Sequence, residues 1–139
     1  MIDGSPAVQV RASLGRDPAA TNSGGVKQVG TTVSGVNDLV TGRLAGSAAG
    51  DHDVDGGPTT ITSPAVSLSG GTNYTLSFSY YLAHGTNADS LRVKVKGATT
   101  STVFEEPGAA NNDNGAWASA TVSLNAFAGQ SVQIVVVTR

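Results

Sequence analysis

Residues 74–80 read YTLSFSY, and this stretch decides the fold class. Its apolar side chains fall at every second position, with Ser and Thr between them. Successive side chains of a β-strand point to opposite faces, so the alternation predicts a strand with Tyr74, Leu76, Phe78 and Tyr80 on one face. Because their neighbours are small and polar, that face is predicted to cover an apolar core.

Other segments extend the β pattern along the chain. Residues 91–96 alternate Leu and Val with Arg and Lys, and residues 117–124 are β-prone. Residues 131–138 are rich in Val and Ile, which predicts a strand buried on both faces. Weaker strand candidates are residues 25–29, 39–41, 59–62 and 102–105.

Turn signals separate these segments: Gly-Gly-Pro at 56–58, Gly-Gly at 70–71, Pro-Gly at 107–108 and Asn-Gly at 114–115. About eight strands punctuated by turns predict an all-β sandwich of the jelly-roll type. Residues 126–129 are predicted to form a brief turn of helix. We assign residues 15–139 to one jelly-roll domain and leave residues 1–14 unassigned, as an N-terminal segment or an edge strand.

Composition narrows the possible functions. Charged residues make up 13 % of the 139 residues, against about 25 % in typical globular domains, and 18 Gly suit a turn-rich surface. Such a composition is typical of secreted bacterial binding modules. The absence of Cys excludes disulfides and thiolate metal sites. A net charge of −2 gives no reason to expect nucleic acid or an anionic membrane as partner.

The sequence holds no recognised catalytic constellation. His52 and His84 lack the spacing of a zinc-protease helix, and neither a G-x-S-x-G elbow nor a phosphate-binding glycine loop is present. Glu105 and Glu106 are neighbours on a predicted strand, so they point to opposite faces and cannot together flank one glycosidic bond. We expect solvated charges there and no enzymatic activity in this chain.

Residues 51–57 read DHDVDGG, which is the most concentrated chemical signal in the chain. Asp51, Asp53 and Asp55 bring three carboxylates into five residues, and calcium takes six to eight oxygen ligands. The stretch begins like an EF-hand loop, but Thr62 stands where the bidentate Glu belongs and no helices flank it. The alternatives left open are a calcium site and a solvated acidic turn.

Two further Asp residues are candidate calcium ligands. Asp89 directly precedes the strand predicted at residues 91–96, and loops from distant strands meet at one rim of a jelly roll. It could therefore complete a site begun by Asp53 and Asp55, or it could cap its own turn. Asp38 is a weaker candidate from the same end of the sandwich.

Aromatic residues offer a second kind of site. Tyr81 and Trp117 are the plausible platform for stacking a sugar ring, with a role in the core or as a loop anchor as the alternative for Trp117. The row of Arg92, Lys94 and Lys96 could contact an anionic polymer, or it forms the solvated face of a strand.

Residues 53–64 resemble the D-V-D-G-G-x-T-T-L-x-S-P signature of a bacterial jelly-roll module that often follows secreted zinc proteases. Four further stretches agree in order, and the likeness spans roughly residues 15 to 135: residues 39–42, 76–81, 90–95 and 124–134. The chain looks most like the C-terminal domain of secreted metallo-aminopeptidases of the aminopeptidase S type. Related modules resemble the P-domain of proprotein convertases.

This resemblance implies a secreted, monomeric accessory domain that binds calcium through Asp53 and Asp55, with Asp89 where the family often has an acidic residue. Its partners would be a catalytic peptidase domain and protein substrates. The alternative is an independent carbohydrate-binding or cell-surface adhesion module. Two departures are that residues 8–11 do not match a tryptophan-bearing start and that the chain stops short of the family's V-D-D-V-like strand.

Overall fold

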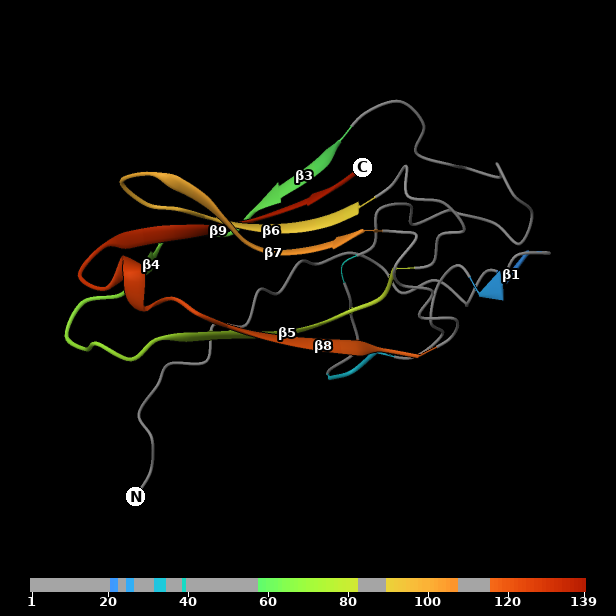
Figure 1. The fold of residues 1–139 in the computed structure, drawn as a ribbon, viewed down its shortest axis with the longest axis horizontal. Helices are drawn as coiled ribbons and strands as arrows, with labels where there is room; N and C mark the ends of the chain where they lie inside the picture. Colours follow the sequence, from blue (N-terminus) through green and yellow to red (C-terminus); the bar gives the residue numbers. More distant parts are fainter. Residues whose placement is uncertain are drawn as a thin grey trace, which may run out of the picture.

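The computed structural model describes residues 58–82, 90–107 and 116–139, with residues 21–22, 25–26, 32–34 and 39. The described residues from 58 onward form two antiparallel β layers packed face to face, which confirms the predicted all-β sandwich (Figure 1). The larger layer has the order β3-β9-β6-β7, with β4 also paired to β9, and the smaller layer is β5-β8. The strands of the two layers are β3 (Thr59–Thr62), β4 (Val66–Ser67), β5 (Thr75–Tyr80), β6 (Ser90–Lys96), β7 (Thr100–Pro107), β8 (Ala118–Ser123) and β9 (Ser131–Thr138).

The strands predicted from alternation match those observed. The bounds predicted for β3 and β9 are those of the structure, and β5, β6 and β8 differ from their predictions by one residue at one or both ends. The candidates at residues 25–29 and 39–41 lie largely outside the described residues, although β2 (Gly25–Val26) pairs with β1 (Thr21–Asn22) and Leu39 is not in a strand. β4 was not predicted, because two residues carry no periodicity.

The last strand, β9, holds the central position of the larger layer. It pairs with β3 on one side and with β6 on the other. Its inward side chains Val132 and Ile134 are buried, but the outward Val135 and Val137 are only half-buried, so burial on both faces was predicted too strongly. The cross-strand neighbours of these two valines on β6 are Lys94 and Arg92, and long basic side chains of this kind can cover apolar surface with their methylene stems.

Ser63 turns the chain from β3 into β4 along the same edge of β9. Ile61 faces Val136 and Val66 faces Val132, so five steps along this edge match four along β9, as in a β-bulge. The buried Ser63 bridges the irregularity: its Oγ accepts from the Ile134 amide at 2.9 Å, and its own amide donates to the Ile134 carbonyl at 2.8 Å. Pro64, which has no amide to donate, follows at the bulge.

One end of the sandwich, here called the closed end, is defined by the buried residues Leu68, Tyr74, Leu124, Phe127 and Val132. The turn of helix predicted at residues 126–129 is a 3-10 turn at Asn125–Phe127, which begins one residue and ends two residues earlier than predicted, and it covers this end (Figure 1). The Asn125 side chain accepts from the Tyr74 amide at 2.7 Å, and the Leu124 amide donates to the Tyr74 carbonyl at 2.8 Å. The core at this end is therefore closed by hydrogen-bonded backbone.

Candidate functional site

The predicted calcium ligands lie outside the described residues: Asp38, Asp51, Asp53, Asp55 and Asp89. Both histidines also lie outside them. Glu105 and Glu106 are the only acidic residues that the structure describes, and no group of three metal-ligating side chains occurs in that part of the chain. The calcium site therefore stays a prediction, and the structure bears on it through the residues that flank these aspartates.

The flanking residues start two strands at the same end of the larger layer. Thr59 and Leu91 both face Thr138, one on each side of β9. Neighbouring strands lie about 4.8 Å apart, which puts the Cα atoms of Thr59 and Leu91 about 10 Å apart. Asp55 comes four residues before Thr59, and Asp89 comes two residues before Leu91. The two acidic segments thus join the sheet within a few residues' reach of each other.

The amides and carbonyls at this end are paired across the sheet. The Ser90 amide donates to the Arg139 carbonyl at 3.0 Å, and the Arg139 amide donates to the Ser90 carbonyl at 3.1 Å. Ser90 and Leu91 are both buried. The residue that follows Asp89 is therefore held in a fixed position.

Glu105 and Glu106 point to opposite faces of β7, as predicted. Glu105 faces outward, where its Oε1 accepts from both Nε and Nη2 of Arg92 at 2.8 Å. The two side chains are 47 % and 36 % exposed, so water screens this ion pair and its contribution to stability is small. Glu106 departs from the expected solvated charge, because it is half-buried and accepts from the Tyr80 hydroxyl at 3.3 Å.

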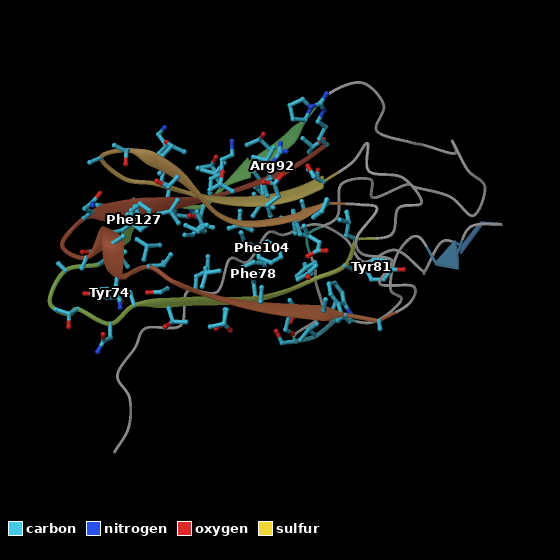
Figure 2. All side chains as sticks on the ribbon, in the orientation of Figure 1. Tyr74, Phe78, Tyr81, Arg92, Phe104 and Phe127 are labelled. Carbon is cyan, nitrogen blue, oxygen red and sulfur yellow. The ribbon has the colours of Figure 1, made fainter. Side chains whose placement is uncertain are left out.

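Glu106 belongs to a group between the two layers, here called the aromatic cluster, that consists of Phe78, Tyr80, Phe104 and Glu106. The Phe78 and Phe104 rings meet edge to face, with centroids 5.2 Å apart and planes at 86°. The Tyr80 and Phe104 centroids are 5.1 Å apart. Figure 2 shows Phe78 and Phe104 meeting between the layers. Sequence analysis missed Glu106 here, although its spacing of two from Phe104 puts both on one face of β7.

Tyr81 and Trp117, the predicted sugar-stacking residues, lie in contact. Their ring centroids are 6.3 Å apart and their planes make 67°, so the edge of one ring meets the face of the other. Both side chains are half-buried, and Tyr81 lies at the end of the sandwich opposite Tyr74 (Figure 2). The structure thus brings together two residues that the sequence separates by 36 positions.

The predicted cationic row lies on the outward face of β6. Arg92 is paired with Glu105, whereas Lys94 faces Thr102 and Lys96 faces Thr100 across the β6–β7 ladder. Lys96 is exposed and Lys94 is half-exposed, which fits the solvated-face alternative. With one of its three charges matched, the row is a weak attractor for an anionic polymer.

Comparison with known proteins finds no matching protein-family model and no matching curated protein. Among the described residues, no helix is long and apolar enough to cross a membrane.

Proposed function

We propose that this chain is a non-catalytic, calcium-binding β-sandwich module and that it serves as the C-terminal accessory domain of a secreted zinc aminopeptidase or protease. The observation that carries the proposal is the shared register partner of Thr59 and Leu91. It supports one site for the acidic stretch before β3 and for Asp89, which precedes β6.

Calcium suits this donor set chemically. Carboxylates brought close together repel each other unless a cation neutralises them, and calcium accepts six to eight oxygens at about 2.3–2.6 Å. Asp53 and Asp55 would supply the first carboxylates and Asp89 the next, with Asp51 and Asp38 as further donors. Calcium held by both segments would tie the start of β3 to the start of β6 and so stabilise that end of the larger layer.

The accessory role is supported by the likeness of residues 53–64 to the module that follows secreted zinc proteases. A module of this kind would stabilise the enzyme, control access to its active site or bind its protein substrate. The peptidase chemistry would belong to the partner domain.

Thermal unfolding in EDTA and in millimolar calcium tests the metal site. An ion that binds only the native state adds about 2.7 kcal/mol at a hundredfold excess over Kd, which raises Tm by several degrees. We expect this shift in the wild type and its loss in the Asp53→Asn/Asp55→Asn variant. The matched control, Asp3→Asn/Asp17→Asn, removes the same charge elsewhere and keeps the shift.

Asp89→Asn tests whether the two segments share one ion. A shared site predicts a smaller calcium shift in this single variant, with a weaker calcium affinity by isothermal titration calorimetry. A wild-type protein whose Tm is the same in EDTA and in 10-fold steps of calcium up to the millimolar range contradicts the proposal. An unchanged affinity in Asp89→Asn leaves calcium at the acidic stretch but removes Asp89 from the site.

A further inference from the structure

The outward face of the β5-β8 layer carries three cross-strand pairs of hydroxyl side chains, followed by an aromatic pair. We call it the hydroxyl face and define it by the cross-strand pairs Thr75–Ser123, Ser77–Thr121 and Ser79–Ser119. Continuing this register by one more pair on the same face gives Tyr81 opposite Trp117, and their rings are in contact. The sequence shows these residues singly, whereas the register shows that they share one surface.

The hydroxyls are available at the surface. Five of the six members of the three pairs are exposed, and Ser79 is half-buried. The Ser77 and Thr121 oxygens lie 3.1 Å apart and those of Ser79 and Ser119 lie 3.2 Å apart, which keeps each pair in register across the strands. A hydroxyl can donate one hydrogen bond and accept two, so each pair retains capacity for a ligand.

Charge separates this face from the other side of the sandwich. No charged residue occurs in residues 58–82 or 116–138, which include both strands of the smaller layer. The outward face of the larger layer carries Arg92, Lys94, Lys96 and Glu105. An ionic ligand on the hydroxyl face would lose water without gaining an opposite charge from the described residues of these two strands, so this face favours an uncharged partner rich in hydroxyl groups.

The aromatic pair indicates which uncharged partner fits. A sugar ring has an apolar face of C–H groups that packs on an aromatic ring, and hydroxyls around its rim that exchange hydrogen bonds with Ser and Thr. The 67° angle between Tyr81 and Trp117 means that they do not form one continuous plane, so the pair accommodates one ring. Successive hydroxyl pairs repeat at about 6.7 Å along the strands, which suits an extended polymer.

We propose that the hydroxyl face binds a neutral polysaccharide, with Tyr81 and Trp117 holding one sugar ring and the hydroxyl pairs contacting the adjoining sugars. This inference goes beyond the proposed accessory function and does not depend on calcium. It gives the module a way to hold the protein on an uncharged glycan.

Affinity electrophoresis of the full chain tests the proposal, in native gels that contain hydroxyethylcellulose, galactomannan, soluble starch or glycol chitin. Polygalacturonate, an anionic polymer, is the ligand control. We expect at least one neutral polymer to retard the wild type and polygalacturonate to have no effect. No retardation by any of the four neutral polymers overturns the proposal.

Two matched substitutions locate the binding surface without disturbing the core. Thr121→Glu places a carboxylate on the hydroxyl face and is expected to weaken binding at least about tenfold, because the charge loses water against an uncharged ligand. Thr102→Glu makes the same change on the exposed outward face of β7 and leaves binding unchanged. Trp117→Ala removes the stacking ring, and its folding is checked by circular dichroism.

Three results would count against the hydroxyl face. Equal binding by Thr121→Glu and the wild type places the ligand elsewhere, and equal weakening by both Glu variants reports a general effect of charge. A wild type that dimerises in sedimentation equilibrium while Thr121→Glu stays monomeric assigns the face to a second copy of the chain.

Discussion

The two ends of the core are built differently. At the closed end, all five defining residues are buried, and the turn at Asn125–Phe127 ties β5 to β8 through the Tyr74 backbone. In the aromatic cluster, every member is half-buried, and the contacts are ring to ring with one tyrosine–carboxylate hydrogen bond. Burial of apolar side chains is therefore expected to stabilise the closed end more than the aromatic cluster, where a polar group, Glu106, lies among the rings.

The largest effect is expected from a substitution that creates a cavity at the closed end. Leu68 is 2 % exposed, so Leu68→Ala is expected to lower the free energy of unfolding by about 3 kcal/mol, measured by chemical denaturation. Val33, which is 56 % exposed, is the control, and Val33→Ala is expected to change stability by less than about 0.5 kcal/mol. A loss below about 1 kcal/mol in Leu68→Ala would mean that burial at the closed end contributes little to stability.

A smaller effect is expected in the aromatic cluster. Phe104→Leu keeps an apolar side chain but removes the ring contacts with Phe78 and Tyr80, for an expected loss of about 1–2 kcal/mol. A double-mutant cycle with Phe78→Leu measures the ring–ring term alone, and we expect a coupling of about 0.5–1.5 kcal/mol. Additive losses in the cycle would show that the two rings are neighbours without specific attraction.

The smallest effect concerns the hydrogen bond between Tyr80 and Glu106. The bond is long, at 3.3 Å, and both residues are half-buried, so Tyr80→Phe is expected to cost less than about 1 kcal/mol. Combining it with Glu106→Ala, which removes the acceptor, in a double-mutant cycle separates this bond from the packing of the ring. A cost above about 2 kcal/mol would indicate that Glu106 is effectively desolvated, which would erase the contrast with the closed end.

The sequence predicted the strands well because each carries its own signal. Alternation in residues 74–80 and the Val and Ile content of residues 131–138 are local properties, and both segments are strands. The pairing of β3 with β9 was beyond reach, because no local pattern specifies which of several strands will meet across 71 residues, as Ser63 and Ile134 do. Glu106 was expected to be a solvated charge, although its spacing of two from Phe104 already indicates the inward face; the Tyr80 hydroxyl that meets it had no signal in the sequence.

The candidate sites show the same difference between local patterns, which the sequence carries, and contacts between distant segments, which it does not. Tyr81 and Trp117 were predicted as a sugar-stacking platform because they are aromatic residues outside the predicted core. Their contact depends on the pairing register of β5 and β8, which the sequence does not specify. The carboxylates of the acidic stretch stay a prediction, because a metal site made by segments from different strands depends on side-chain placement and not on spacing along the chain.

The central position of β9 also has a consequence for the timing of folding. During synthesis, β3 and β4 leave the ribosome some seventy residues before the strand that they pair with, and β6 waits with one edge uncovered. Pairings so distant in sequence make folding slow and leave strand edges open to the wrong partners. The larger layer is therefore expected to assemble only after residues 131–138 emerge, and until then the edges of β3, β4 and β6 that pair with β9 stay uncovered.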